Sequence, residues 1–489
     1  MELKNLEDKS TGAKLRWYNI ALLSFTVVWG FTNVVNNFAN QGLTVVFSWI
    51  LIMLLYFIPY TLMVGQLGAT FQNLGAGVSS WINELLGSGW AYLAAWTYWV
   101  VHVPYLAQKP QIIMISLSWL FKGNGSFVQQ TSPLVVQGLS LVMFLAFVWL
   151  AATRGVEALK KLGNIAGILL FIMSFLFIIL GISAPFIVHI PVATPDMGHI
   201  SSYIPKLDFQ YLTTISMLVF AVGGCEKISP YVNKTHNASK EFPKGMIVLA
   251  IIVALSAILG SIGMGIVINA HHIPNDLMAN GAFEAFQILG EYYHVGNLFL
   301  WIFAITNTLG SATALAVSID APLRMLLDEA DPHYIPKALS KKNKKGIAIN
   351  GYKMVAVLVS ILIIVPALGI KGMSNLYNWL LNLNSICMPL RYLWVFLAYI
   401  LLVKKMDQYH SDYVFVKSKP IGYAFGVWTF VFTAFACILG MVPKANMYSS
   451  TSSWWFQISM NVATPIILIL LGLILPLIAR KTNKLEDNK

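Results

Sequence analysis

The chain has 489 residues, of which 57% are hydrophobic and 11% charged, with a mean hydropathy of +0.69 and a formal net charge of +12. These values lie far outside the range of soluble globular proteins and exclude that class. The composition is typical of a protein that crosses the membrane many times.

Apolar runs long enough to cross about 30 Å of hydrocarbon predict twelve transmembrane spans. In chain order they lie near residues 17–38, 44–65, 90–119, 134–152, 163–185, 211–231, 246–269, 295–319, 353–370, 376–402, 421–442 and 458–479. Residues 1–16 precede the first span as a short N-terminal segment, and residues 480–489 form a short C-terminal tail. The loops between the spans are too short for folded extramembrane domains.

The positive charge follows the predicted topology. With both termini in the cytoplasm, 25 of the 32 Lys and Arg residues lie on the cytoplasmic side, and the opposite loops hold only Lys122, Lys206, Lys371 and Lys444. This asymmetry is what the positive-inside rule predicts for that orientation. The basicity is therefore topological, and nucleic acid is not an expected partner.

Motifs for catalysis, cofactors and metals are absent from the sequence. Cys225, Cys387 and Cys437 lie in apolar runs without paired spacing, so neither a disulfide framework nor a zinc site is expected. No His-x-x-x-His pair, Gly-x-Ser-x-Gly motif or phosphate loop occurs. We expect no enzyme activity and no cofactor.

Two spans carry helix-weakening residues at corresponding places. The first contains Gly30 followed by Thr32, and the sixth contains Gly223 and Gly224. Glycine also serves close helix packing in membranes, but paired interrupted spans in two halves of a chain point to a transporter binding site. If residues 17–185 and 211–402 are inverted repeats, residues 17–402 form a ten-helix transport core and residues 421–479 add two helices.

Charged residues within the spans are expensive and are candidates for function. Glu226 is the one carboxylate well within a span, and we predict a gating or protonatable group there, with a structural ion pair as the alternative. Lys227 beside it either snorkels to the cytoplasmic surface or serves the site. Arg391 in the tenth span is the partner of an acid such as Glu226, a contact for a substrate carboxylate, or a side chain that snorkels from the helix end. Lys109 in the third span is either an interface lysine or a substrate contact, and the nearby His102 is a packing residue or a proton relay.

The sixth span carries a family signature. FAVGGCE at 220–226, then NKT at 233–235 and KEFPKG at 240–245, resembles the motif of the amino acid–polyamine–organocation transporters. GFTNVVNNFANQG at 30–42, GAGVSSW at 75–81 and the segment 324–345 are similar to the bacterial glutamate/GABA-antiporter-like branch.

That resemblance implies an all-α integral membrane protein with a LeuT-like 5+5 inverted repeat, twelve helices, and spans 1 and 6 broken at the midplane. Substrate contacts carried over from the family are Trp29, Gly30, Phe31, Thr32, Phe220, Gly223, Gly224 and Cys225. The family glutamate, linked to gating or proton coupling, corresponds to Glu226. Val28-Trp29-Gly30 stands where many relatives have a Gly-Ser-Gly-like turn, and residues 163–185 lack the lysine of some proton-coupled members.

The sequence therefore predicts a secondary active transporter in a bacterial cell membrane. We expect an amino acid/amine antiporter of the glutamate/GABA type, working by alternating access on small amino acid or amine substrates. A proton-coupled symporter, or an exchanger of a neutral or aromatic amino acid for its decarboxylated amine, is the alternative. A channel or a substrate-sensing receptor built on the same helices is a different class that also stays open.

Overall fold

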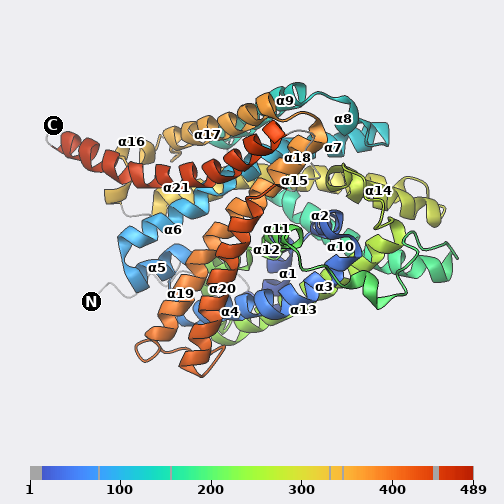
Figure 1. Ribbon diagram of the computed structural model, residues 1–489. Coiled ribbons are helices and arrows are strands. Elements are labelled where there is room, and N and C mark those ends of the chain that lie inside the picture. Colours follow the sequence, from blue (N-terminus) through green and yellow to red (C-terminus); the bar gives the residue numbers. More distant parts are fainter. Residues whose placement is uncertain are drawn as a thin grey trace.

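The computed structural model describes residues 14–74, 77–154, 157–329, 332–343, 346–443 and 451–487. Within these ranges the regular structure is helical, apart from one isolated bridge between Leu15 and Thr235. In Figure 1 the long helices α13, α17 and α21 run roughly along the long direction of the molecule, α19 and α20 are inclined to it, and α2 is seen nearly end-on. Helices are expected of a chain that must satisfy its backbone groups inside a bilayer.

The α-helices have the following bounds. They are α1 (Trp17–Val28), α2 (Phe31–Gln41), α3 (Val45–Ile52), α4 (Ile58–Thr70), α5 (Val78–Leu86), α6 (Ser88–Val100), α7 (His102–Lys122), α8 (Ser126–Gln130), α9 (Pro133–Arg154), α10 (Glu157–Ile187), α11 (Phe209–Thr213), α12 (Ile215–Ala221), α13 (Ala238–Val267), α14 (Leu277–Tyr292), α15 (Leu298–Arg324), α16 (Lys337–Ser340), α17 (Ile349–Gly369), α18 (Met373–Cys387), α19 (Tyr392–Lys404), α20 (Lys419–Gly440) and α21 (Thr451–Asp487). Short 3₁₀ segments are η1 (Gly42–Thr44), η3 (Ile200–Tyr203), η4 (Cys225–Lys234), η6 (Pro332–Tyr334) and η7 (Met388–Arg391), and π-helical turns are η2 (Met53–Phe57) and η5 (Met325–Glu329).

Ten helical segments in the described ranges are long and apolar enough to span a membrane. They are Phe31–Thr70, Pro133–Arg154, Lys161–Ile187, Phe209–Ser229, Ala238–Val267, Leu298–Leu327, Ile349–Gly369, Met373–Lys404, Lys419–Gly440 and Thr451–Thr482. The chain is thus a multi-pass membrane protein.

The sequence predicts twelve spans, and the difference arises in two regions. The predicted span 17–38 is divided between the short apolar helix α1 and α2, which continues into the segment Phe31–Thr70. The predicted span 90–119 falls on α6 and α7, and α7 carries polar residues such as Gln108 and Lys109 that lower its hydropathy. For these two regions the span count stays a prediction.

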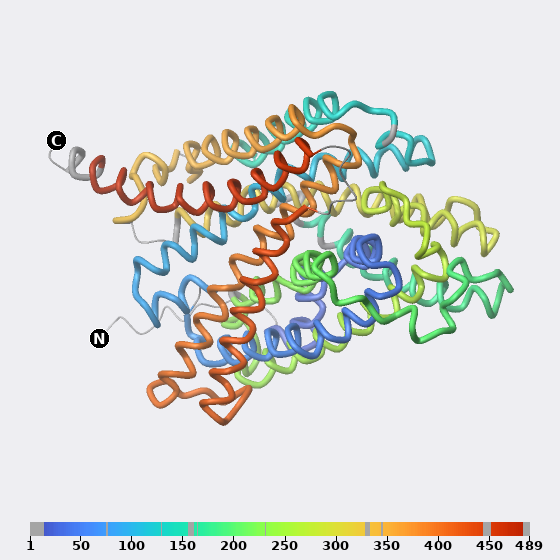
Figure 2. The backbone as a smooth tube through the Cα atoms, in the orientation of Figure 1, coloured from blue at the N-terminus to red at the C-terminus, as the bar shows by residue number. Residues whose placement is uncertain are grey.

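The first and sixth predicted spans lie in the interior of the helix assembly. In Figures 1 and 2, α1, α2, α11 and α12 occupy the middle, with α3, α4 and α13 on one side and α9, α17 and α21 on the other. The inner helices pack on their neighbours, α1 against α13 and α12 against α18 and α20. This places both glycine-containing segments away from lipid.

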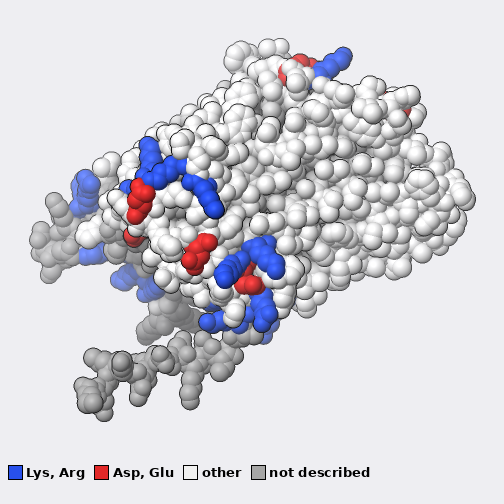
Figure 3. All heavy atoms as spheres, turned by 90° about the horizontal axis from the view of Figure 1, so that it is seen from below, with Lys and Arg blue, Asp and Glu red and all other residues white. Residues whose placement is uncertain are grey.

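Surface charge is unevenly distributed over the face of the molecule seen in Figure 3. On the face seen in Figure 3, Lys and Arg gather mostly toward one end, and a broad surface without charge covers most of the remainder. Large apolar side chains such as Leu54, Val142 and Leu368 are exposed on the outside of the helices. An apolar exterior of this kind is suited to contact with lipid.

Candidate functional site

The first helix break lies between α1 and α2. Trp29 (φ −120°, ψ 145°) and Gly30 (φ −155°, ψ 155°) are extended, so the helix stops at Val28 and restarts at Phe31. The N–H of Trp29 still donates to the Phe25 carbonyl at 2.8 Å. The new N-terminus of α2 leaves first-turn N–H groups and the positive end of a helix dipole in the protein interior.

The second break follows α12, which ends at Ala221. Gly224 has φ +111°, in the left-handed region that favours glycine, and it precedes η4. Gly223 meets a different constraint, because a Cβ there would lie 2.0 Å from the ring of Tyr392. The two adjacent glycines thus serve two purposes: one allows the turn and the other allows close packing.

Asn33 connects the two breaks. Its side-chain Nδ2 donates to the Val28 carbonyl at 3.4 Å and to the Ala221 carbonyl at 3.2 Å. These are the backbone oxygens at the ends of α1 and α12, which the breaks leave without helical partners. One side chain therefore holds the two interruptions next to each other.

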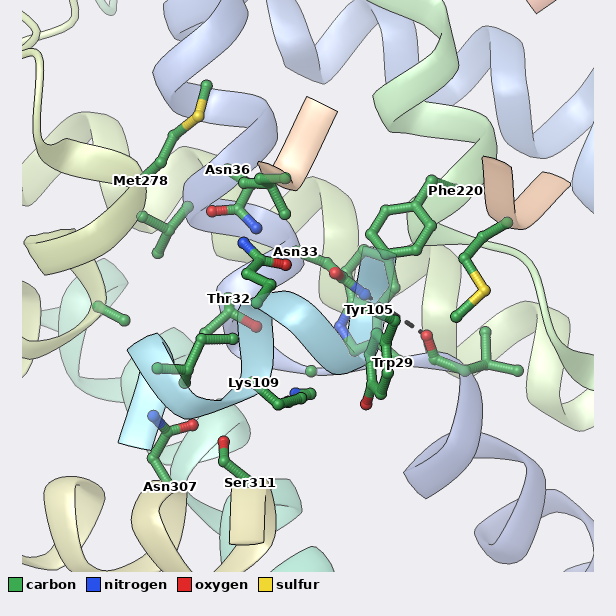
Figure 4. A pocket seen from close by; sticks show the side chains of 18 of the residues that line it. Trp29, Thr32, Asn33, Asn36, Tyr105, Lys109, Phe220, Met278, Asn307 and Ser311 are labelled. Atoms are coloured by element: carbon green, nitrogen blue, oxygen red, sulfur yellow. Dashed lines mark hydrogen bonds between the residues drawn. The ribbon is translucent and has the colours of Figure 1, made fainter. Parts of the chain in front are cut away.

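A cavity of about 240 Å³ lies at these breaks. Figure 4 shows Trp29, Thr32, Asn33, Lys109 and Phe220 around it, with Asn307 and Ser311 at the lower edge of the view. Its lining comes from α1, α2, α7, α12, α14, α15 and α18 and from the segments around Gly223 and Arg391. Because drug-sized ligands need at least about 300 Å³, this space suits a small metabolite.

Most of the predicted site residues line this cavity. The members are Trp29, Gly30, Thr32, Phe220, Gly223, Lys109, Lys227 and Arg391. Phe31, Gly224, Cys225 and Glu226 do not line it, although all belong to the two breaks. Phe31 packs against Phe177, Phe286 and Phe303, while Cys225 and Glu226 are buried behind the cavity wall.

Glu226 and Arg391 form a buried ion pair. Arg391 Nε lies 3.3 Å from Glu226 Oε1, and the hydroxyl of Tyr60 on α4 donates to Glu226 Oε2. The guanidinium also contacts the Tyr392 hydroxyl at 3.3 Å and lies over the rings of Tyr98 and Tyr392. Arg391 therefore pairs with an acid and also lines the cavity, and its contact with a substrate carboxylate stays a prediction.

His102 lies behind this pair and does not line the cavity. Its Nδ1 is 2.7 Å from the Tyr98 carbonyl, and its Nε2 is 3.4 Å from Arg391 Nη1. Since a guanidinium can only donate and a carbonyl can only accept, both contacts are satisfied by neutral histidine with its proton on Nδ1. The geometry matches the packing role for His102.

Three cationic side chains line the cavity, and no Asp or Glu is among its described lining residues. Arg391 is paired with Glu226, whereas neither Lys109 nor Lys227 has a salt bridge in the described part of the chain.

Lys109 is half-buried, with its ammonium 4.7 Å from the centre of the Tyr105 ring. Lys227 is exposed between the buried residues Glu226 and Ile228, and it lines the cavity. The ammonium of Lys227 can therefore be accommodated at the cavity, and the side chain need not reach the cytoplasmic surface.

Three further cavity residues have buried polar atoms without a hydrogen-bond partner in the described structure. These atoms are Trp29 Nε1, Asn36 Oδ1 and Gln108 Nε2. An unpaired buried donor or acceptor is costly. A polar ligand in the cavity would supply the missing partners.

Sequence reasoning missed several aromatic residues around the site. Tyr60, Tyr98, Tyr105 and Tyr392 come from four separate helices, α4, α6, α7 and α19, and each lies in an apolar run where tyrosine is unremarkable. Asn33 lies in the segment GFTNVVNNFANQG, but its contacts with two separate helix ends depend on how those helices pack. Among the described residues, no group of three or more His, Cys, Asp or Glu side chains is placed to hold a metal ion.

Comparisons with known proteins agree with this architecture. The family model described as amino acid permease matches residues 15–473. The chain is 55% identical over 472 residues to the aspartate/glutamate permease AcaP of Lactococcus lactis subsp. cremoris, covering 96% of each chain.

More distant relatives are named as exchangers. The glutamate/gamma-aminobutyrate antiporter of Lactococcus lactis subsp. lactis is 24% identical over 84% of this chain and 80% of its own length. The probable agmatine/putrescine antiporter AguD of the same organism is 23% identical over 74% of this chain and 73% of its own length. The chain therefore belongs to the amino acid permease family, within the amino acid–polyamine–organocation superfamily, and is a membrane transporter, not an enzyme.

Proposed function

We propose that this protein is a secondary active transporter that exchanges acidic amino acids by alternating access, with substrate held in the cavity between the two helix breaks. The observation that carries the proposal is the charge of that cavity: Lys109, Lys227 and Arg391 line it, and no described lining residue is acidic. Because Arg391 is paired with Glu226, a substrate with excess negative charge would compensate mainly the two lysines. The relative AcaP, which is named for aspartate and glutamate, supports the same substrate class.

The α-amino and α-carboxylate groups of the substrate match the polarity of the breaks. The N-terminus of α2 favours a carboxylate, and the C-terminus of α12 favours an ammonium. Trp29, Gly30, Phe31 and Thr32 would serve the carboxylate, and Phe220, Gly223, Gly224 and Cys225 the ammonium. Phe31, Gly224 and Cys225 do not line the cavity, so their proposed part is to shape the backbone of the two breaks.

The LeuT-like repeat belongs to the proposal. Its support is the position of the breaks, one in the first predicted span and one in the sixth, both in the interior (Figure 1). The turn at Gly42, with φ +59°, separates α2 from α3 and so makes α1 with α2 one crossing and α3 with α4 the next. If α6 and α7 together form the third crossing, the chain has twelve spans. Ten of them lie in the core 17–402 and two in 421–479.

Glu226 is the proposed gating or proton-coupling group. It lies at the start of η4, directly after the break, and its two carboxylate oxygens contact Arg391 and Tyr60 from two other helices. A change in its protonation would loosen contacts among three elements at once. Such a group is placed to link proton uptake to movement of the broken helix.

Both termini are proposed to lie in the cytoplasm of a bacterial cell. Segments assigned to the cytoplasmic side contact one another, as Leu15 N–H does with the Lys234 carbonyl and Lys405 Nζ with the Leu85 carbonyl. Segments assigned to the outside do likewise, as Ala193 N–H does with the Ile266 carbonyl. The bacterial membrane rests on the organisms of the relatives.

A second candidate is proton-coupled symport of the same substrates. The observation behind it is the buried pair of Glu226 with Arg391, since a carboxylate that takes up a proton serves either mechanism. The exchange of polyamines, as the name of the relative AguD would suggest, is disfavoured because a dication would face the ammonium groups of Lys109 and Lys227 in this cavity.

The test is uptake into proteoliposomes that contain the purified full-length protein. Vesicles are preloaded with aspartate, glutamate, GABA, a neutral amino acid or buffer, and uptake of labelled aspartate and glutamate is measured with and without a pH gradient. Protein-free liposomes are the control.

Stimulation by an internal amino acid would establish exchange and name the exchanged pair. Uptake that needs only an inward proton gradient would replace exchange by symport. No uptake of either acidic amino acid under any condition would overturn the proposed substrate class.

A further inference from the structure

Two lysines in the cavity have charges that the protein does not neutralise. Lys109 comes from α7 and Lys227 from η4, and neither is within salt-bridge distance of a carboxylate among the described residues. A cation held within the membrane without a partner is expensive, so it normally faces a counter-ion or an aqueous path. Both side chains line the same cavity.

Arg391 differs from these lysines although it lines the same space. Its Nε lies 3.3 Å from Glu226, and its Nη1 and Nη2 lie 3.4 and 3.3 Å from His102 and Tyr392. Its side chain is 3% exposed. The charge of Arg391 is thus largely compensated by groups of the protein. The positive charge that remains open to a ligand comes from Lys109 and Lys227.

The breaks and the lysines supply different recognition elements. The helix ends at the breaks match an α-carboxylate and an α-ammonium, groups that every amino acid carries. The side chain of Lys227 runs past Gly224. A Cβ added to Gly224 would lie 4.0 Å from Cδ and Cε of Lys227 and 3.5 Å from Nη2 of Arg391. Lys109 lines the same cavity from α7, and its ammonium lies 4.7 Å from the centre of the Tyr105 ring, which also lines it (Figure 4).

From these positions we infer that Lys109 and Lys227 form the subsite for the side-chain carboxylate of a dicarboxylic amino acid, and that this pair sets the preference for acidic over neutral substrates. The inference rests on the proposed function and names the residues that select its substrate. A charge-assisted hydrogen bond from an ammonium to a carboxylate is about twice as strong as a neutral one. An amide in place of the carboxylate loses that charge while keeping nearly the same shape.

The experiment compares substrates that differ only in this group. Uptake of labelled aspartate into proteoliposomes is measured in competition with unlabelled aspartate, asparagine, glutamate or glutamine. The ratio of inhibition by each acid to inhibition by its amide is the preference ratio of that pair. The variants are Lys109→Gln, Lys227→Gln and the charge-preserving Lys227→Arg. Lys122→Gln is the matched control, because Lys122 is exposed at the end of the same helix as Lys109 and does not line the cavity.

Each glutamine variant should lower the acid-to-amide preference by about tenfold or more, as loss of a charged hydrogen bond predicts. Lys227→Arg should retain most of the preference, and Lys122→Gln all of it. If a glutamine variant does not fold, the arginine variant and direct binding of asparagine against aspartate to the wild-type protein still measure the preference.

Unchanged ratios in both glutamine variants would overturn the inference while leaving acidic amino acid transport in place. A wild-type protein that binds aspartate and asparagine equally would overturn it as well. If replacing chloride by gluconate alters uptake in the wild type but not in the lysine variants, and the ratios stay constant, the subsite holds an inorganic anion instead. Failure of the wild type to take up any acidic amino acid would count against the proposed function itself.

Discussion

Arg391 Nε lies 3.3 Å from Glu226 Oε1, and the two side chains are 3% and 0% exposed. The pair joins η4, just after the second helix break, to η7, which continues α18. Burial removes both charges from water, so each depends on the other for compensation. The contact thus ties the wall of the cavity to the segment that the glycines interrupt.

Removing one member of this pair should be worse than removing both. We expect Glu226→Gln or Arg391→Gln alone to destabilise the protein by about 3 to 5 kcal/mol, because the remaining charge stays buried without its partner. The double variant should recover part of that loss. Thermal unfolding of the purified protein in detergent checks the cycle, and additive losses would show that the two groups act independently.

Glu226→Gln should also flatten the pH dependence of transport. The substitution keeps the shape of the side chain and removes the group that we propose to exchange a proton. Initial uptake rates in proteoliposomes between pH 5 and 8 provide the measurement, with Glu84→Gln as a control far from the cavity. A profile that keeps the wild-type shape would assign Glu226 a purely structural role.

Gly223→Ala should impair transport through Tyr392. The added Cβ would lie 2.0 Å from the tyrosine ring, which packs against the guanidinium of Arg391. Overpacking of this kind costs about 1 to 3 kcal/mol or displaces the ring. We expect weaker substrate binding and a lower unfolding temperature.

Gly138→Ala is the matched control for that substitution, because Gly138 lies in α9 with no atom within 4 Å of an added Cβ. It should be neutral or stabilise the helix by up to about 1 kcal/mol. Equal effects of the two substitutions on transport would rule out the close contact with Tyr392 as the cause.

Trp29→Phe should weaken substrate binding without a comparable loss of stability. The indole Nε1 lines the cavity region without a hydrogen-bond partner, so a bound substrate is its expected acceptor. Losing a hydrogen bond to a charged group should raise Kd by about tenfold or more. Trp379→Phe removes an equally unpartnered indole N–H away from the cavity and should leave Kd unchanged. Isothermal titration with aspartate distinguishes the two, and equal losses would contradict the proposed contact.

A pH-dependent contact lies in the loop after α10, outside the membrane-spanning helices. The Ser202 hydroxyl lies 2.6 Å from Asp196 Oδ2, and His271 Nε2 lies 2.7 Å from Asp196 Oδ1. These hydrogen bonds, the one from Ser202 more strongly, lower the pKa of Asp196 to about 2. A carboxyl whose pKa is lowered by folding stabilises the protein above its unfolded pKa of about 3.9, and that stability disappears as the pH falls toward 2.

Asp196→Asn should therefore lower the unfolding temperature by a constant amount above about pH 4, and the difference should shrink below it. Asp412→Asn, at an exposed pair with His410, should have little effect at any pH. Unfolding curves of the three proteins between pH 7 and 3 make the comparison, and a difference that grows on acidification would contradict the sign.

Much of the architecture was predictable because membrane insertion depends on local composition. Apolar runs indicated the spans, and the described structure has ten segments of the required length and hydropathy. The motif around Glu226 identified the family that the comparisons show. The glycines at 30, 223 and 224 marked the two places where the helices stop, because glycine at such positions weakens a helix whatever surrounds it.

The composition of the cavity was decided only by the tertiary structure. Whether Arg391 pairs with an acid, whether Lys109 faces lipid headgroups or substrate, and where Lys227 points depend on which helices pack together, and a single sequence does not encode those distances locally. Tyr60 and Tyr392 reach the site from α4 and α19, more than 150 residues away from Glu226 along the chain. The sequence by itself determined where the helices break, and packing among distant helices decided which charges the protein neutralises and which remain open to a substrate.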